Sequence, residues 1–158
     1  MENWYLLYHQ ERRFPSILKE LDKAEVVHYM PVKECFVPRS DRKCLRKAQP
    51  RPLFPCYMFV YFDVEVIHTS TISAIDGAIC FVRSGGLPYQ VPEKIVSELK
   101  SYPFKVINIS DEYFETRNAS PLIFNKVAAI YEQPDRQARV SELLALLELP
   151  DYSLALTG

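Results

Sequence analysis

The sequence predicts an α+β fold in which a four-stranded sheet packs against helices and is followed by a small C-terminal module. Three observations lead to this prediction. Residues 56–62 are apolar at odd and at even positions alike. Since side chains alternate between the two faces of a strand, this is typical of a strand buried on both faces. Residues 14–21 place apolar side chains at the i, i+3, i+4 and i+7 spacing of an amphipathic helix. No glycine occurs between residues 108 and 157, so the last third of the chain differs in composition from the rest.

The elements before the central strand follow from local patterns. Residues 3–8 are rich in aromatic and aliphatic side chains and predict the first strand. Pro15 suits the first turn of the helix that follows, where a backbone N–H is not needed. Residues 26–32 predict a second strand. Residues 33–51 hold seven basic and two acidic side chains and few apolar ones, so we expect a projecting hairpin or long loop, the basic arm.

After the central strand, residues 64–75 have near-helical spacing, and Gly77 is expected to follow the helix end with a positive φ. Residues 79–83 predict the fourth strand. A turn at residues 85–88 leads to a helix that opens at Pro92.

The C-terminal third gives mixed signals. Residues 102–112 contain no clear period and turn acidic, which is typical of a linker. Residues 122–131 predict a strand, because they contain the continuous apolar run at 127–131. Residues 137–149 have strong helix propensity residue by residue. The sequence therefore leaves both a helical and a β module open.

Charge is divided unevenly along the chain. The net charge of the 158 residues is −1, which by itself implies no partner. Residues 1–107 hold 15 basic and 12 acidic side chains, whereas residues 108–158 hold 4 basic and 8 acidic ones. Such asymmetry indicates two functional parts, one of which faces nucleic acid.

Several classes of protein are disfavoured. The four cysteines lack the two-residue spacing of zinc or redox sites, which favours reduced thiols in a cytoplasmic protein. We expect no signal peptide and no membrane association, because no apolar stretch approaches the length of a membrane span. No Asp–His–Ser arrangement is legible, so we expect no enzymatic activity.

Several segments resemble, in order, the N-terminal domain of the NusG family of transcription elongation factors. They read WYLLY at residues 4–8, PLFPCYMFV at 52–60 and GAICFVR at 77–83. The segment FDVEVIHTSTI at 62–72 is similar to the specialised RfaH-type paralogues within that family. The tail resembles the RfaH type more loosely, chiefly in AIYEQPD at 129–135.

This resemblance implies an N-terminal α/β sandwich over residues 1–101, with a four-stranded antiparallel sheet. A linker over 102–112 and a KOW-related module over 113–158 would follow. In the family that module is a small β-barrel or, in the RfaH type, a helical hairpin that masks the polymerase-binding face. Helix propensity favours the hairpin for the isolated protein, with the barrel as an accessible alternative.

The resemblance also implies a function. It indicates an operon-specific factor that binds bacterial RNA polymerase across the cleft, on the clamp helices and the opposite pincer, and suppresses pausing and termination. Non-template or upstream DNA is a further implied partner, and the C-terminal module would recruit a ribosomal protein or Rho. No cofactor or metal is implied, and we expect a monomer.

The resemblance assigns polymerase binding to an aromatic surface and to a hydroxyl-rich tract. An aromatic patch supplies a large contact area at low entropy cost. From pattern alone, such strand side chains more often fill a core, and hydroxyls at a helix start more often cap the helix. The residues concerned are Tyr8, Phe54, Pro55, Tyr57 and Phe59 for the surface, and His68, Thr69, Ser70 and Thr71 for the tract.

Basic side chains form the third candidate site, since clustered Lys and Arg contact phosphates. A solvated helix face explains the group near the first helix equally well, whereas the one-sided charge of the basic arm favours nucleic acid or a polymerase loop. The residues are Arg12, Arg13, Lys19 and Lys23 near the helix, and Arg42, Lys43, Arg46 and Lys47 in the arm.

The chain departs from the RfaH type at the expected DNA-reading positions. Gln10, Ser16, Glu20 and Asp76 stand where basic or imidazole side chains would favour base contacts. The DNA element that is read is therefore different, weaker or absent.

A second departure concerns the contact between the two domains. Arg51 stands where the RfaH type has a carboxylate that pairs with the arginine matched here by Arg139. Two like charges are expected to repel by up to about 1 kcal/mol if exposed. This predicts that masking does not operate through that pair.

A competing interpretation is a general RNA-binding module without polymerase contact, in which the aromatic side chains stack on bases. The RNP-type pattern of such modules is absent, which favours the polymerase-binding interpretation.

Overall fold

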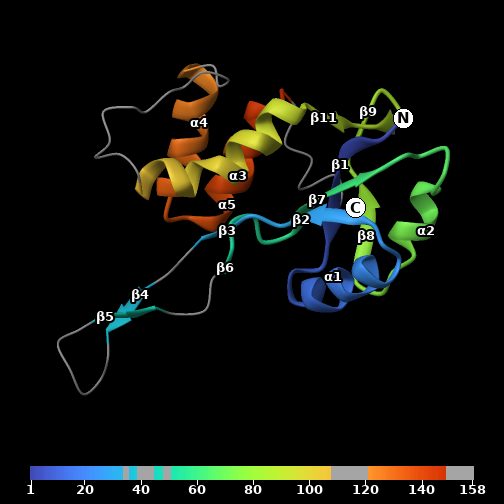
Figure 1. The fold of residues 1–158 in the computed structure, drawn as a ribbon, viewed down its shortest axis with the longest axis horizontal. Helices are drawn as coiled ribbons and strands as arrows, with labels where there is room; N and C mark the ends of the chain where they lie inside the picture. Colours follow the sequence, from blue (N-terminus) through green and yellow to red (C-terminus); the bar gives the residue numbers. More distant parts are fainter. Residues whose placement is uncertain (34–35, 39–44, 48–50, 108–120, 149–158) are drawn as a thin grey trace.

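The computed structural model describes residues 1–33, 36–38, 45–47, 51–107 and 121–148 (Figure 1). The strands are β1 (Asn3–His9), β2 (Val27–Tyr29), β3 (Val32–Lys33), β4 (Phe36–Pro38), β5 (Leu45–Lys47), β6 (Arg51–Pro52), β7 (Tyr57–Phe62), β8 (Ala78–Phe81), β9 (Arg83–Ser84), β10 (Leu87–Pro88) and β11 (Gln90–Val91). The helices are a short 3-10 turn η1 (Glu11–Arg13), α1 (Phe14–Lys23), α2 (Thr69–Ser73), α3 (Glu93–Ile107), α4 (Pro121–Glu132) and α5 (Arg136–Leu146).

The main sheet is antiparallel and has five strands in the described residues. Its order is β11-β1-β7-β2, and β8 also pairs with β1. The four strands expected from the sequence correspond to β1, β2, β7 and β8. The fifth, β11, pairs with Trp4 and Tyr5 of β1. The expectation of four strands was wrong because β11 is only two residues long, too short to leave an alternation in the sequence.

Each face of the sheet carries its own hydrophobic cluster. On one face, Met58, Val60 and Phe62 of β7 pack with buried side chains of α1 and α2. On the other face, Tyr57 and Phe59 belong to the cluster that contains α3, α4 and α5. The prediction that this strand is central and covered on both faces is confirmed, because β7 lies between β1 and β2 and is buried at both parities.

Local signals explain where the first elements begin and end. Pro15 lies in the first turn of α1, where it removes no helical hydrogen bond. Gly77 has φ +97°, as expected, although α2 has already ended at Ser73. A Cβ on Gly77 would lie 2.4 Å from Cβ of Arg13, so only glycine fits between α2 and the 3-10 turn.

The basic arm forms a hairpin, one of the two forms that the sequence predicts. Strand β3 pairs with β6 at its base, and β4 pairs with β5 further along the arm. Figure 1 shows the β4–β5 ladder standing away from the main sheet. A segment poor in apolar side chains gains little by packing against the core, which fits a β4–β5 ladder that stands away from the main sheet.

The C-terminal region differs from one expectation. Residues 122–131 lie in α4, so the prediction of a strand there was wrong. The buried side chains Val127, Ile130 and Tyr131 follow helical spacing, and Ala129 between them is exposed. A continuous apolar run cannot distinguish a buried strand from a helix that buries one face. Helix α3 runs to Ile107, so the expected linker begins after that residue and otherwise lies outside the described residues.

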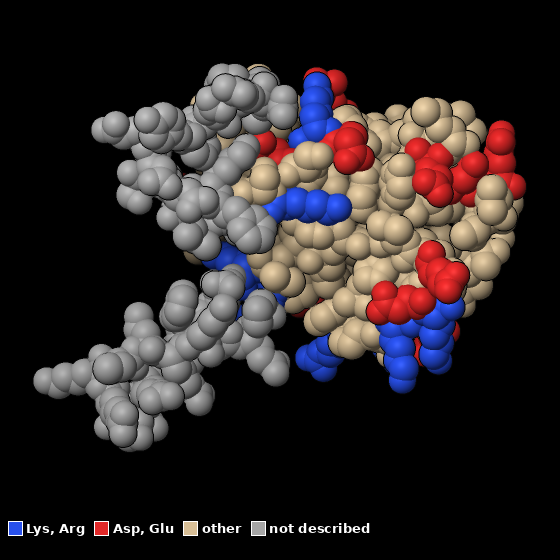
Figure 2. Space-filling view, in the orientation of Figure 1, with Lys and Arg blue, Asp and Glu red and all other residues tan. Residues whose placement is uncertain are grey.

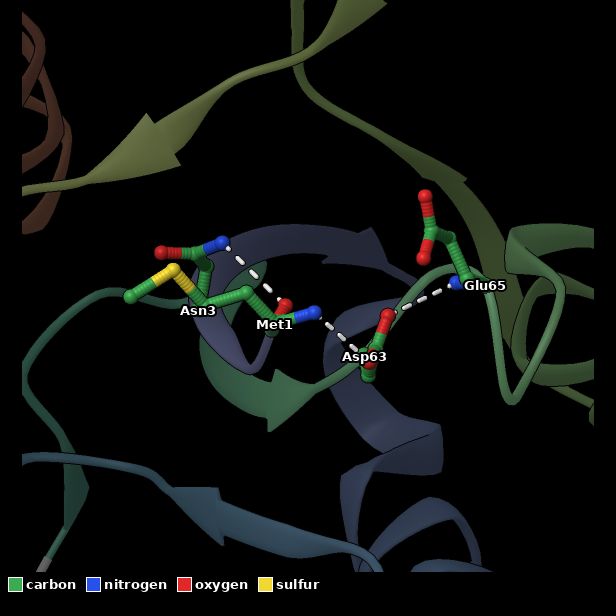
Figure 3. A network of polar contacts seen from close by, with 4 residues as sticks. All are labelled: Met1, Asn3, Asp63 and Glu65. Atoms are coloured by element: carbon green, nitrogen blue, oxygen red, sulfur yellow. Dashed lines mark hydrogen bonds and ion pairs between the residues drawn. The ribbon is translucent and has the colours of Figure 1, made fainter.

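Polar contacts join the start of β1 to the end of β7 (Figure 3). The amino group of Met1 donates to Oδ2 of Asp63 at 2.7 Å, and the backbone N–H of Glu65 donates to Oδ1 at 2.9 Å. These hydrogen bonds lower the pKa of Asp63, with the contact to the amino group as the largest cause.

Candidate functional site

Helices α4 and α5 form a C-terminal hairpin that covers one face of the sheet. We call Tyr8, Phe54, Pro55, Tyr57 and Phe59 the aromatic face. Phe54 and Phe59 are 0% exposed, Tyr57 is 3% exposed, Pro55 is buried and Tyr8 is half-buried. Phe54, Tyr57 and Phe59 belong to one buried cluster that also contains side chains of the hairpin. The hairpin contributes Val127, Ile130, Tyr131, Val140, Leu143, Leu144 and Leu147 to this cluster. The hairpin thus completes a core around the side chains proposed for docking.

Ring contacts fix the orientation of the aromatic face. The rings of Tyr8 and Tyr57, which are paired across β1 and β7, have centroids 5.2 Å apart. Phe59 stacks on Tyr29 of β2 at 6.1 Å. Cross-strand aromatic pairs of this kind stabilise both the sheet and the positions of the rings. Contacts within the sheet therefore position the rings of the aromatic face, and the hairpin packs against them.

Arg139 of α5 is the polar centre of the contact between hairpin and sheet. Its side chain is 5% exposed, and its Nε donates to the carbonyl oxygen of Leu53 at 2.8 Å. Its Nη1 donates to the carbonyl oxygen of Gln133 at 2.7 Å. Arg51 is exposed. Backbone carbonyl groups of the N-terminal domain and of the hairpin thus accept hydrogen bonds from Arg139.

Tyr131 of α4 fills a gap in the hydrogen bonding of α3. Its hydroxyl donates to the carbonyl oxygen of Leu99 at 2.8 Å. The residue four positions after Leu99 is Pro103, which has no N–H to donate to that carbonyl. Tyr131 also stacks on Tyr102 at 4.8 Å.

Burial strongly raises the pKa of the Tyr131 hydroxyl, and the nearby Tyr29 raises it further. Burial also raises the pKa values of Tyr29, Tyr89 and Tyr102, which surround the hairpin. Each of these hydroxyls is therefore harder to deprotonate in the closed structure than in a free tyrosine.

Two further contacts hold the ends of the hairpin. The Tyr89 hydroxyl donates to the carbonyl oxygen of Leu147, just after α5, at 2.9 Å. At the other end of α5, Arg136 forms an ion pair with Glu11 of the 3-10 turn. Both groups of this ion pair are partly exposed, so its contribution to docking is small, about 0–1 kcal/mol.

The hydroxyl-rich tract lies at the start of α2. Nδ1 of His68 accepts from the backbone N–H of Ser70 at 3.1 Å, so His68 is the N-cap of the helix. Capping is thus performed by the imidazole, whereas the sequence had suggested that the Thr and Ser hydroxyls would do it. His68, Ser70 and Thr71 are exposed, and Thr69 is half-buried. Figure 1 shows α2 on the opposite side of the sheet from α4 and α5, so the hairpin leaves the tract accessible.

The basic side chains near α1 lie among acidic ones. Arg13 pairs with Asp76 at 3.3 Å, and Lys23 pairs with Glu20 at 3.4 Å. Figure 2 shows blue and red side chains together over this part of the molecule. The exposed residues Arg12 and Lys19 have no ion pair within the described part of the chain. These two are the better candidates for phosphate contacts.

The arm residues proposed for nucleic acid cannot be placed in the same way. Arg42 and Lys43 lie outside the described residues. Arg46 and Lys47 belong to β5, of which only the backbone is described.

Sequence reasoning missed four residues of the site: Tyr131, Tyr89, Glu11 and Arg136. For Tyr131 a signal existed, since Val127, Ile130 and Tyr131 have the i, i+3, i+4 spacing of one helix face. The other three act through contacts between residues 58 to 125 positions apart, which no local pattern reveals.

The described residues contain no cluster of three or more side chains suited to a metal ion. Over the same residues, no helix combines the length and apolar character that a membrane span requires.

Comparison with known proteins decides the family. Residues 2–100 match the family model described as "Transcription termination factor nusG". The chain belongs to the NusG family. Members of this family are transcription elongation and termination factors that bind RNA polymerase. The match covers the whole sheet, α1 and α2, including the aromatic face and the hydroxyl-rich tract, whereas α4 and α5 lie outside it.

A solved structure is also similar to this NusG-family protein. It is titled "Domain interaction in Thermotoga maritima NusG", and the two sequences are 19% identical, with a TM-score of 0.44. The similarity covers 64% of this chain and 56% of the Thermotoga maritima chain.

Proposed function

We propose that this protein is an operon-specific elongation and antitermination factor of the RfaH type, whose aromatic face binds the clamp helices of RNA polymerase. One observation carries the proposal: the C-terminal hairpin and the aromatic face share a single buried cluster. A family surface that binds polymerase has to be exposed at the moment of binding. The closed structure therefore represents a resting state in which the hairpin occupies the polymerase site.

The proposal requires an equilibrium between closed and open forms. Polymerase binds the open form, so closure lowers its apparent affinity by the fraction of molecules that are open. An open fraction of about 1% would weaken binding roughly 100-fold. A specific signal at the target operon would restore it by favouring the open form. Selectivity then comes from the hairpin as well as from contacts to DNA.

The remaining parts have accessible positions for their proposed roles. The tract from His68 to Thr71 contacts the opposite pincer of the polymerase, and the hairpin leaves it exposed. Arg12, Lys19 and the basic arm contact upstream or non-template DNA. After release, the C-terminal module refolds toward a KOW-like barrel that recruits a ribosomal protein or Rho. The apolar run at 127–131, which fits a strand as well as a helix, supports this step.

The test is a pull-down with core RNA polymerase, combined with a pause-site transcription assay. Leu143→Ala removes a fully buried hairpin side chain, and we expect it to increase polymerase binding and pause suppression because docking weakens. Adding Tyr57→Ala to this variant should abolish the gain. Tyr61→Ala in the same background is the matched control, because Tyr61 lies on the same face of β7 but outside the aromatic face.

Two results would count against the proposal. One is equal polymerase binding by wild type and Leu143→Ala with no effect of Tyr57→Ala. The other is that the protein binds single-stranded RNA but not polymerase, and that Tyr57→Ala abolishes the RNA binding. That result would favour a general RNA-binding module.

A further inference from the structure

A cavity of about 530 Å³ lies where the hairpin meets the N-terminal domain. Its wall contains Phe14, prolines from the N-terminal domain and from the hairpin, and five charged side chains. Those five are Glu11, Lys33, Arg51, Arg136 and Arg139. The cavity is within the size range of small-ligand sites, and proline walls keep its shape without offering hydrogen-bond donors.

The charge of this cavity is strongly one-sided. Among the described residues of its lining, four of the five charged side chains are basic, and Glu11, the acidic one, already pairs with Arg136. Arg51 has no ion pair within the described part of the chain, and it lies directly across the β3–β6 ladder from Lys33. Like charges gathered around a hollow repel one another, and a bound anion removes that repulsion.

The position of the arginines on α5 gives a second, independent argument. Arg136 is the first residue of α5 and Arg139 lies in its first turn, where no acidic side chain is present. The N-terminal end of a helix carries partial positive charge, so basic side chains are disfavoured there and anions are favoured. Asp135 caps the helix through Gln137 N–H but does not line the cavity. An anion bound at this helix end would offset the unfavourable position of the two arginines.

We propose that the cavity is a binding site for a compact multivalent phosphate, such as pyrophosphate or the polyphosphate group of a nucleotide. Guanidinium groups bind phosphate oxygens in pairs, and Arg51, Arg136 and Arg139 line this volume. Arg51 is the exposed one without a described ion pair, whereas Arg136 pairs with Glu11 and Arg139 donates to backbone carbonyl groups. Lys33 and Arg51 come from the N-terminal domain, whereas Arg136 and Arg139 come from the hairpin. A phosphate held between them binds only the closed form and stabilises it.

This site goes beyond the proposed function, because ligand binding needs no polymerase. Only its regulatory consequence, a phosphate that keeps the hairpin docked, depends on that function.

Pyrophosphate titrated into the purified full-length chain tests the site directly. We expect measurable heat of binding and a rise in Tm of several degrees, relative to chloride at equal ionic strength. ATP should act like pyrophosphate, and AMP should be at least about tenfold weaker.

Arg51→Ala should weaken pyrophosphate binding at least about tenfold, and Arg51→Glu should abolish it. Lys94→Ala, which removes an exposed basic side chain outside the cavity, is the matched control and should bind as wild type does. If Arg51→Ala lowers Tm without ligand, Arg51→Gln serves instead, because it removes the charge but retains the Cβ and Cγ methylene groups and a polar end.

Unchanged affinity in Arg51→Glu would overturn the site, as would a Tm response that chloride reproduces. Single-stranded DNA that binds in an Arg51-dependent manner while pyrophosphate does not would also overturn it, in favour of a nucleic-acid contact. None of these outcomes affects polymerase binding, so failure of the site and failure of the proposed function are distinguishable.

Discussion

The Nε of Arg139 lies 2.8 Å from the carbonyl oxygen of Leu53, which joins the C-terminal hairpin to the segment that leads into the aromatic face. The two residues are 86 positions apart, and both are buried. Leu53 immediately precedes Phe54, so the arginine fixes the backbone beside a residue that we propose to bind polymerase. A buried polar contact of the hairpin thus lies next to the surface that the hairpin covers.

Arg139→Ala should loosen the hairpin. The change leaves the buried carbonyl oxygens of Leu53 and Gln133 without these donors, at a cost of about 1–3 kcal/mol. We expect a lower Tm and stronger polymerase binding, measured by thermal unfolding and pull-down. Gln137→Ala is the control, because this exposed side chain lies on the same helix. An unchanged Tm in Arg139→Ala would show that the observed hydrogen bonds do not stabilise docking.

Tyr131→Phe tests the contact with α3. Because Pro103 cannot donate to the Leu99 carbonyl, loss of the hydroxyl leaves that buried oxygen unsatisfied. We expect destabilisation of about 1–3 kcal/mol in denaturant unfolding at neutral pH. Tyr61→Phe removes a tyrosine hydroxyl from the sheet and serves for comparison. Equal stability of the two variants would contradict the role assigned to Tyr131.

Alkaline pH should destabilise the closed form. The pKa values of Tyr29, Tyr89, Tyr102 and Tyr131 are raised in the folded protein, chiefly by burial. A raised pKa means that the folded state holds its proton more tightly than the unfolded state, whose tyrosines titrate near pH 10. Stability from this source is complete below about pH 10 and falls as pH rises above it. Denaturant unfolding between pH 9 and 11.5 measures the decline, which should be shallower in Tyr131→Phe.

His68 offers a way to separate helix capping from polymerase binding. His68→Ala removes the acceptor of the Ser70 N–H and should destabilise α2 by about 0.5–2 kcal/mol. Asparagine is a good N-cap, so His68→Asn should keep the Tm close to that of wild type. If the tract binds the opposite pincer through the imidazole, both variants lose pause suppression when measured in the Leu143→Ala background. Full activity of His68→Asn would leave His68 with a capping role alone.

Arg12 and Lys19 test the proposed contact with DNA. Each phosphate contact that is lost should lower the slope of log affinity against log salt by about 1. We therefore expect Arg12→Ala and Lys19→Ala to weaken binding to DNA of any sequence and to flatten its salt dependence. Lys23→Ala is the comparison, since Lys23 is engaged with Glu20. A salt slope equal to that of wild type in both variants would assign the two side chains to a solvated helix face.

Much of the N-terminal fold could be predicted from the sequence because its signals are local. The run at 56–62 is apolar at both parities and became the central strand β7, and the helical stripe from Phe14 to Leu21 became α1. Gly77 was expected to have positive φ and has it. The aromatic and hydroxyl-rich residues were chosen because they stand in segments that resemble the NusG family, and their roles stay predictions.

The amino-acid sequence by itself determined which segments fold locally and which chemical groups are available, since periodicity, turn residues and charge are properties of neighbouring positions. Only the tertiary structure decided that residues 122–131 form a helix, and that Tyr57 and Phe59 are covered on one side by the hairpin. It also decided that Arg139 bonds to Leu53. The physical reason is that burial and hydrogen-bond satisfaction depend on contacts between distant positions, and an apolar run fits strand or helix equally well until its partner is in place.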